Sequence, residues 1–471
     1  MSRLSTLACV AGLILSPWAS AQLSPKVASS LQATNLPSSA ISVAVLPLDG
    51  PASAAQWHLA DEARNPASTM KLLTTWAGLQ RLGPSWQWQT DLLATQAPVK
   101  GVLNSPLYLR GRGDPKITLE RMWLLVRELR ATGVDDIAGP LVLDASYFQR
   151  SPQRSEYDDD GDTERAFLVE PDALISNFRT LRINFDSTGE RVQLRVDPPL
   201  NQVRVSNQLA IGSGGNCAEW AKRVQQRMGE VSGSEFLVQY VGEMPPGCQA
   251  ERYVPVLNPQ SYTQALFWHL WYLNGGKGSG KTEFATTPAG AQRLAGSRSP
   301  DLVSTVRDIN KFSNNLMARQ LYLTIGAESN VAGIYTDDKA ATAIRDTLQQ
   351  AGLRWPELVL ENGSGLSRSE RISARHLAEL LREAARGPYA AEFISSLPLV
   401  GLDGTMKKRL GELAGQAHIK TGSLRDVRAV AGYVRDRQGR NWAVVGIVNH
   451  PEAAKAGPAL DQLIREVWQA K

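Results

Sequence analysis

The sequence is poor in the residues that ligate metals and build disulfide scaffolds. Its 471 residues include only three cysteines and five histidines, and the histidines (58, 269, 376, 418 and 450) show no metal-ligand spacing. We therefore predict no metal ion and no cofactor. After the N-terminal region there is no run of about 18 apolar residues, which argues against a membrane span in the mature chain. Neither sign of charge predominates, because the sequence has 51 basic and 46 acidic residues.

The first 21 residues have the pattern of a secretory signal peptide. Arg3 precedes an apolar run from Leu4 to Leu15, and Ala19-Ser20-Ala21 supplies a small-residue cleavage site before Gln22. We therefore predict a periplasmic protein with no nucleic-acid partner and at most a peripheral association with membranes. The sequence does not indicate the oligomeric state.

Two cysteines, Cys217 and Cys248, remain once a signal peptide over residues 1–21 is removed. In an oxidising compartment we favour a disulfide between them over two buried free thiols. In the chain-entropy model, a loop of this length stabilises the fold by about 3–4 kcal/mol.

The pattern of predicted helices and strands changes near residue 90 and again near residue 290. This predicts an insert within a domain that is built from both ends of the chain. Residues 22–90 contain a predicted β-hairpin (40–60) and a helix, and residues 291–471 contain helices, a strand at 417–424 and a hairpin at 429–448. Between them, residues 91–290 show short strands separated by Gly, Pro and Asp turns, with one helical pattern at 119–129. We predict that the two ends form one domain of helices and strands, and that 91–290 is a β-rich insert of one or two modules.

The stretch Asn65–Lys71 opens an apolar helix that runs towards Gly83-Pro84. Ser68 and Lys71 are three positions apart, so the hydroxyl and the amine lie one turn apart on the same face. Lys71 is the only charged residue between Arg64 and Arg81, and burial lowers the affinity of an amine for its proton. Ser68 is therefore a candidate nucleophile with Lys71 as its base. From this stretch alone, a surface serine beside a snorkelling lysine is the alternative.

Two further motifs favour the catalytic interpretation. Ser313-Asn314-Asn315 lies in a polar break between two helical segments, and Lys420-Thr421-Gly422-Ser423 lies on a predicted strand. Ser-x-x-Lys, Ser-x-Asn and Lys-Thr-Gly together, in this order, are the signature of penicillin-binding proteins and serine β-lactamases. We predict that Ser313 relays a proton to the leaving amine and that Asn315 holds Lys71 or a substrate amide.

The strand motif has the groups that bind a substrate carboxylate and stabilise an oxyanion. Lys420 would supply a fixed positive charge, Thr421 a short hydrogen-bond donor, and Gly422 room for the substrate backbone. The backbone N–H groups of Ser68 and Ser423 would form the oxyanion hole.

With these motifs the chain resembles the D-alanyl-D-alanine carboxypeptidase/endopeptidases, the class C low-molecular-mass penicillin-binding proteins of type 4. Gly111–Pro115, Asn362–Arg368 and the 397–405 stretch are also similar to recurrent stretches of that family, although Glu361-Asn362 stands where an Asp is expected. The resemblance implies an α+β fold, in which a transpeptidase-like domain has an antiparallel sheet flanked by helices and carries a large insert.

The resemblance also implies a function. Ser68 would form an acyl-enzyme on peptidoglycan stem peptides, and β-lactams would acylate the same serine. In such proteins an acidic insert residue reads the ammonium of the stem peptide's diamino acid, a role open to Asp159 or Asp160. The alternatives are a serine β-lactamase, for which no deacylation base beyond Lys71 is visible, and a catalytically idle wall-binding scaffold.

Two stretches imitate other sites. Gly275–Thr282 satisfies the phosphate-loop pattern, but Pro288 and Gly290 would break the helix that must follow, so a flexible surface loop is the better interpretation. Residues 156–167 imitate a calcium loop but have Phe167 where a bidentate glutamate belongs, which favours a solvated acidic loop.

Overall fold

The computed structural model describes residues 23–152, 166–232 and 235–470. At its centre lies a five-stranded antiparallel sheet in which the two ends of the chain pair directly, with Val43 opposite Gly446. In spatial order its strands are β19 (Ala417–Leu424), β20 (Val427–Arg435), β21 (Asn441–Asn449), β1 (Ile41–Pro47) and β2 (Gln56–His58).

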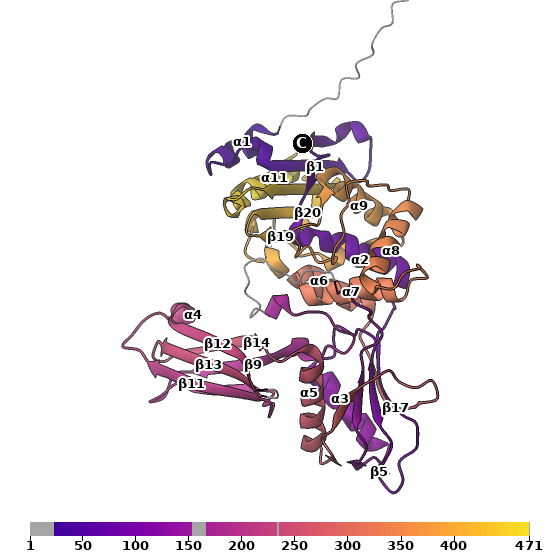
Figure 1. The fold of residues 1–471 in the computed structure, drawn as a ribbon. Helices are drawn as coiled ribbons and strands as arrows, with labels where there is room; N and C mark the ends of the chain where they lie inside the picture. Colours follow the sequence, from indigo (N-terminus) through magenta and orange to yellow (C-terminus); the bar gives the residue numbers. More distant parts are fainter. Residues whose placement is uncertain (1–22, 153–165, 233–234, 471) are drawn as a thin grey trace, which may run out of the picture.

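Helices cover both faces of this sheet, and alternation along the strands builds two cores. In β20, Ala429, Ala431 and Tyr433 face one core, whereas Val430 and Val434 face the other. The first core is closed by α2 (Lys71–Leu82), α6 (Leu302–Phe312), α7 (Asn315–Ala327), α8 (Thr336–Gln350), α9 (Ala374–Arg386) and α10 (Ala390–Ser396). The second is closed by α1 (Pro25–Gln32) and α11 (Gly457–Gln469), which lie side by side (Figure 1).

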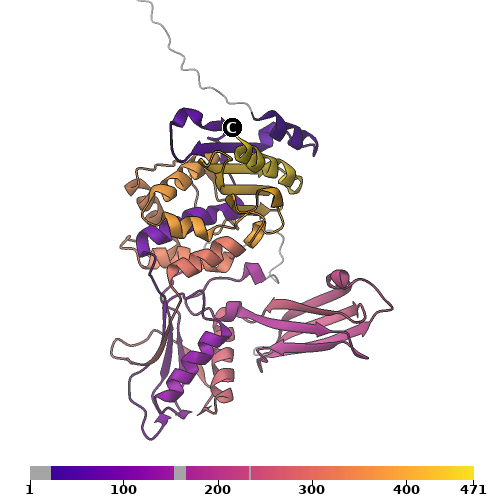
Figure 2. The same ribbon diagram turned by 180° about the vertical axis from the view of Figure 1, so that it is seen from behind.

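The insert leaves this domain through two strands that pair with each other. β4 (Gln89–Ala94) leads in and β17 (Gln292–Arg298) leads out, with Gln89 opposite Arg298. The insert therefore spans 89–298 rather than the predicted 91–290, because the exit strand extends the pairing beyond Gly290. Both modules hang below the sheet domain, seen from behind in Figure 2.

One insert module is a five-stranded sheet backed by two helices. The order is β16 (Thr282–Phe284), β8 (Leu141–Asp144), β6 (Leu107–Gly111), β4 and β17, with α3 (Leu119–Ala131) and α5 (Pro259–Leu273) packed against it. A small sheet of β15 (Lys277–Gly278), β7 (Asp136–Ile137) and β5 (Val102–Leu103) adjoins it. The prediction of a single helix in the insert is wrong. α5 is apolar around most of its circumference, so it shows no helical period, although Asn258 caps it and Pro259 begins it.

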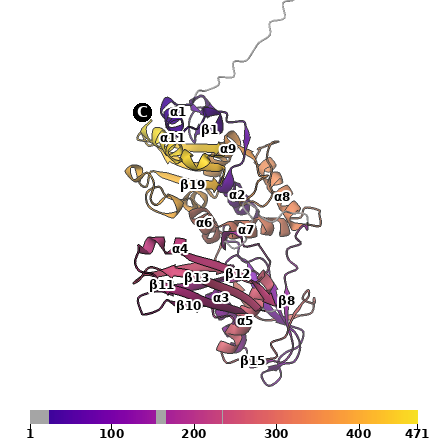
Figure 3. The ribbon, with the colours of Figure 1, turned by 60° about the vertical axis from the view of Figure 1, so that its left-hand side comes forward.

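The other module consists of two three-stranded sheets that project sideways in Figure 1 and lie in front of the first module in the view of Figure 3. One sheet contains β10 (Gln193–Asp197), β9 (Thr180–Asp186) and β14 (Gln249–Pro255), and the other contains β11 (Val203–Ile211), β13 (Glu235–Met244) and β12 (Val224–Ser232). Cys217 and Cys248 form a disulfide with their Cα atoms 5.5 Å apart, which ties the segment around α4 (Trp220–Arg223) to the start of β14. Among the described residues, no helix is both long and apolar enough to cross a membrane.

Candidate active site

The candidate nucleophile lies in a 3₁₀ turn that precedes helix α2. The turn covers Ala67–Met70 and α2 begins at Lys71, so Ser68 is not in the first turn of an α-helix as we predicted. The difference favours the pair, because residues i and i+3 eclipse in a 3₁₀ turn. Ala67 has a positive φ of 45°, a costly conformation for a residue with a Cβ, just before Ser68.

The turn is anchored to the sheet by a reciprocal amide pair. Asn65 N–H donates to Asn449 Oδ1 at 2.9 Å, and Asn449 Nδ2 donates to the carbonyl of Asn65 at 2.9 Å. The Asn65 side chain then accepts from Ala67 N–H at 2.9 Å. Since Asn449 ends β21, the sheet fixes the position of the nucleophile turn.

Lys71 is fully buried, as its isolation in an apolar helix indicated. Its Nζ lies 2.9 Å from Ser68 Oγ, donates to Asn315 Oδ1 at 2.6 Å and also donates to the carbonyl of Ser364. Burial, followed by the charge of Lys420, holds the pKa of Lys71 well below its usual range, against an opposing effect of Glu370. A neutral amine has two N–H groups and one lone pair. With the two carbonyl oxygens taking the N–H groups, the lone pair faces Ser68, as a general base requires.

A second serine–lysine pair faces the first from the sheet edge. Ser313 ends α6 in the left-handed conformation, with φ 57° and ψ 36°, and Asn314 caps α7 by accepting from Met317 N–H. Lys420 Nζ donates to Ser313 Oγ at 2.8 Å and to the carbonyl of Thr421 at 2.7 Å. The three motifs that we singled out therefore converge on one site.

Burial changes the expected role of Lys420. We predicted a fixed positive charge, but complete burial lowers the pKa of Lys420 to about 7. The amine is therefore only partly protonated near neutral pH. An incoming carboxylate would raise the pKa of Lys420 and restore its charge. Binding of the ligand and protonation of Lys420 are therefore coupled.

Gly422 lets the edge strand approach the nucleophile turn. A Cβ at this position would lie 2.7 Å from the carbonyl oxygen of Pro66 and 3.2 Å from Ala67 Cβ. β19 is the edge strand of the central sheet, so its outer edge runs beside the turn that carries Ser68. The oxyanion hole from the N–H groups of Ser68 and Ser423 stays a prediction.

Ser364 and Thr405 are two site residues that the motifs did not indicate. Ser364 acts through its backbone carbonyl, for which residue type gives no signal. Thr405 Oγ1 lies 2.9 Å from Thr421 Oγ1, the hydroxyl of the Lys-Thr-Gly motif. Both residues lie in stretches that are similar to recurrent stretches of the family, Asn362–Arg368 and 397–405. That similarity is the feature of the sequence that could have indicated them.

The insert reaches the site through Phe167. Its carbonyl oxygen accepts from Asn315 Nδ2 at 3.2 Å, which turns the Asn315 side-chain oxygen towards Lys71. A hollow of about 310 Å³ lies beside this contact, with Phe167 and Tyr253 of the insert facing Phe312 and Ser313 of the sheet domain. Asp159 and Asp160 lie outside the described residues, as does most of the calcium-like loop.

The phosphate-loop pattern forms two short strands instead of the predicted flexible loop. Lys277-Gly278 forms β15, parallel to β7, and Thr282–Phe284 forms β16, parallel to β8. No helix follows Thr282 directly, so the loop lacks the helix N-terminus that would hold a phosphate. Within the described part of the chain, no group of three or more His, Cys, Asp or Glu side chains could hold a metal ion.

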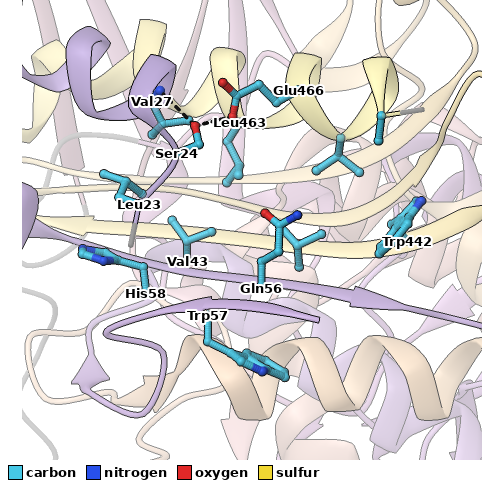
Figure 4. Close-up of a pocket in the computed structure, with 13 residues that line it drawn as sticks. Leu23, Ser24, Val27, Val43, Gln56, Trp57, His58, Trp442, Leu463 and Glu466 are labelled. Carbon is cyan, nitrogen blue, oxygen red and sulfur yellow. Dashed lines mark hydrogen bonds between the residues drawn. The ribbon is translucent and has the colours of Figure 1, made fainter. Parts of the chain in front are cut away.

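A second hollow, of about 210 Å³, lies at the opposite end of the central sheet, next to β2 (Figure 4). Its walls are mostly apolar side chains of α1, α11 and strand β1, such as Val27, Val43 and Leu463. Ser24 and Glu466 hydrogen-bond to each other at its rim. None of the three motifs contributes to this hollow.

Comparison with known proteins agrees with this geometry. The D-alanyl-D-alanine carboxypeptidase of an Actinomadura species is 26% identical over 417 residues, covering 85% of this chain and 76% of the relative. DacB of Haemophilus influenzae is 26% identical over 396 residues, covering 81% and 80%. The crystal structure of penicillin binding protein 4 from that organism superposes with a TM-score of 0.79 at 23% identity, covering 95% of this chain and 100% of the other. A structure of its complex with a β-lactam gives a TM-score of 0.75 at 22% identity, with the same coverage.

Fold and site together define a serine acyl-transferring enzyme of the penicillin-binding-protein fold class. A model of the D-Ala-D-Ala carboxypeptidase 3 (S13) family matches residues 23–467, and the chain belongs to that family. The predicted α+β fold and the predicted class of enzyme, a serine-type D-alanyl-D-alanine carboxypeptidase, are thereby confirmed.

Proposed function

We propose that this protein cleaves D-alanyl-D-alanine bonds of peptidoglycan stem peptides through an acyl-enzyme on Ser68. The observation that carries the proposal is the setting of Lys71, a buried amine of lowered pKa whose two carbonyl acceptors leave its lone pair to Ser68. This arrangement allows Lys71 to take the hydroxyl proton of Ser68 as the oxygen attacks an acyl carbonyl.

The reaction follows from the positions of the two serine–lysine pairs. Ser68 Oγ attacks the carbonyl of the penultimate D-alanine while Lys71 takes its proton, and the tetrahedral intermediate gathers negative charge on the former carbonyl oxygen. Collapse breaks the amide bond, and Ser313 passes the proton that Lys71 took from Ser68 on to the leaving amine, which returns Lys71 to its neutral form. Ser313 Oγ itself accepts from Lys420 Nζ at 2.8 Å. Water then attacks the ester, releasing the shortened peptide and free Ser68.

The substrate carboxylate would lie against Lys420 and Thr421. This binding explains why a partly protonated lysine suffices, because the carboxylate itself draws the proton onto the amine. When the leaving group is a free D-alanine the enzyme is a carboxypeptidase, and when it is the amine of a cross-link the enzyme is an endopeptidase. The open hollow between Phe312 and Tyr253 leaves room for the second peptide.

β-Lactams would acylate Ser68 as well, because their ring amide and carboxylate present the same pair of groups. A serine β-lactamase would also need a base for fast deacylation. Glu370, the carboxylate whose charge opposes the lowering of the Lys71 pKa, is fully buried and accepts four backbone N–H groups, so it is not exposed to a hydrolytic water. Slow release of the penicilloyl group is therefore expected.

Export to the periplasm fits a peptidoglycan substrate. The proposal rests on the signal-peptide pattern of residues 1–21, which lie outside the described part of the chain. Cys217 and Cys248 form a disulfide, which an oxidising compartment preserves.

The experiment compares purified wild-type protein and Ser68→Ala on uncross-linked and cross-linked muropeptides. Release of terminal D-alanine and conversion of dimers to monomers by the wild type alone would support both activities. If neither substrate is cleaved and no penicillin is bound, the protein is an idle scaffold. If penicillin is hydrolysed with rapid turnover, it is a β-lactamase.

A further inference from the structure

Glu370 is a fully buried carboxylate enclosed by the backbone of a single loop. Its Oε1 accepts N–H groups from Glu361 at 3.1 Å, Asn362 at 3.0 Å and Gly363 at 2.9 Å. Its Oε2 accepts from Gly365 N–H at 2.9 Å. An anion held by four backbone donors fixes the path of those residues, so one side chain determines the shape of the loop 361–370, here called the Glu370 loop.

This loop contacts the nucleophile turn and the first turns of α2 at three points. The carbonyl of Ser364 accepts from Lys71 Nζ, and the carbonyl of Gly363 accepts from Thr74 Oγ1 at 2.6 Å, one turn further along α2. Gly365 has a φ of 77°, and a Cβ there would lie 1.8 Å from the carbonyl oxygen of Ala67. The shape of the loop therefore determines whether the Ser364 carbonyl can accept a hydrogen bond from Lys71 Nζ.

We propose that Glu370 is a positioning residue that aims the Ser364 carbonyl at Lys71 and thereby sets the pH range in which Ser68 is acylated. The inference rests on the proposed function and adds to it a residue that does not touch the substrate. Glu370 acts in two ways, by shaping the loop and by placing a buried negative charge near the amine.

The electrostatic setting has contributions of both signs. Burial and the charge of Lys420 lower the pKa of Lys71, and Glu370 raises it. In the described part of the chain, the other side chains that hydrogen-bond to Lys71 are the neutral Ser68 and Asn315. Glu370 itself has a raised pKa because it is buried, with its backbone donors opposing that effect and the charge of Glu361 adding to it. Loss of the Glu370 charge therefore leaves the amine deprotonated at lower pH.

Asn362 offers a second place for the same charge. Its Oδ1 accepts from the N–H of Ser364 at 2.8 Å and from the Ser364 hydroxyl at 2.6 Å. Asn362→Asp would place a carboxylate at this position, adjacent to the residue whose carbonyl meets Lys71. The two positions allow the charge to be removed, added or moved within one loop.

The test measures the rate of acylation by a fluorescent penicillin from pH 5 to pH 10 in the full mature chain. Glu370→Gln removes the charge, Asn362→Asp adds one, and the double variant moves it. Glu361→Gln is the matched control, because Glu361 lies in the same loop and its carboxylate accepts from Ser367 and Ser369 rather than shaping the backbone at Lys71. Circular dichroism checks that each variant is folded.

We expect the midpoint of the acid limb to fall by about one pH unit in Glu370→Gln, to rise in Asn362→Asp and to return towards the wild type in the double variant. Glu361→Gln should keep the wild-type midpoint within about 0.3 units, since its carboxylate accepts from the Ser367 and Ser369 hydroxyls and holds none of the backbone N–H groups bound by Glu370. If Glu370→Gln does not fold, the upward shift in Asn362→Asp carries the test. Unchanged midpoints in the folded variants would overturn the inference while wild-type labelling upholds the proposed function. Absence of labelling in the wild type would overturn both.

Discussion

Lys71 Nζ lies 2.9 Å from Ser68 Oγ in a site where the amine is fully buried and has two carbonyl oxygens as its other partners. Burial, followed by the charge of Lys420, holds the pKa of Lys71 well below its usual range, which favours the neutral amine. The rate of acylation should therefore rise with pH as Lys71 loses its proton and becomes able to act as a base.

Lys71→Ala should abolish acylation while leaving the fold intact. Removing the base leaves Ser68 without a group to take its proton, and general-base catalysis contributes a factor of about 10²–10⁴. Labelling by a fluorescent penicillin measures the loss, and circular dichroism checks the fold. Lys408→Ala, at an exposed position, is the control and should label like the wild type. Labelling that survives in Lys71→Ala would remove Lys71 from the mechanism.

Lys420→Met should stabilise the protein more at neutral pH than near pH 10.5. The pKa of Lys420 is about 7 in the folded state and 10.5 in the unfolded state, so the unfolded chain binds more protons between those values. This difference makes the wild type gain stability as pH rises from 7 to 10.5. We expect Lys420→Met to raise the free energy of unfolding by about 1–2 kcal/mol at pH 7.

The gain in Lys420→Met should vanish near pH 10.5, where the amine is neutral in the folded state and losing its charge in the unfolded state. Urea unfolding of both proteins at pH 7 and pH 10 measures the difference. An equal gain at both pH values would show that the buried amine does not carry the pKa shift.

Thr405→Val should weaken substrate binding without changing stability. It removes the partner that lies 2.9 Å from the Thr421 hydroxyl, which is then free to rotate away from the substrate carboxylate. One neutral hydrogen bond corresponds to a rise in KM of about threefold to tenfold. Steady-state release of D-alanine from a stem peptide measures it, and Thr405→Ser should restore the wild-type KM. If the serine variant behaves like the valine variant, the hydroxyl is not the cause.

Gly365→Ala should both destabilise the fold and block acylation. The new Cβ would lie 1.8 Å from the Ala67 carbonyl oxygen at a φ of 77°, so the nucleophile turn must shift. We expect a loss of at least about 2 kcal/mol in the free energy of unfolding. Gly290→Ala, with open space around its Cβ, should stay within about 0.5 kcal/mol of the wild type. Chemical denaturation of the two variants makes the comparison, and equal stabilities would contradict the packing argument.

Motifs and periodicity predicted much of this molecule, because its chemistry uses distinctive residue types. Ser68, Lys71, Ser313, Asn315 and Lys420 come together as the three motifs implied, and the strand at 417–424 has the predicted bounds. The hairpins at both ends also form, since alternating apolar residues face two separate cores.

The features that could not be predicted from the sequence depend on backbone groups or on burial by tertiary packing. α5 is apolar on nearly all sides and lacks a helical period. Ser364 contributes a carbonyl oxygen, which every residue possesses, and Glu370 acts on four N–H groups of its own loop. The lowered pKa of Lys420 depends on burial by tertiary packing, which a strand motif does not reveal.

The most direct test of the account is the mass of the intact protein after brief exposure to a penicillin, followed by peptide mapping. We predict one penicilloyl adduct per chain on the peptide that contains Ser68, persisting long after free penicillin is removed, and no adduct on Ser68→Ala. An adduct on another residue, or an adduct that persists in Ser68→Ala, would contradict the central claim that Ser68 is the acylated nucleophile.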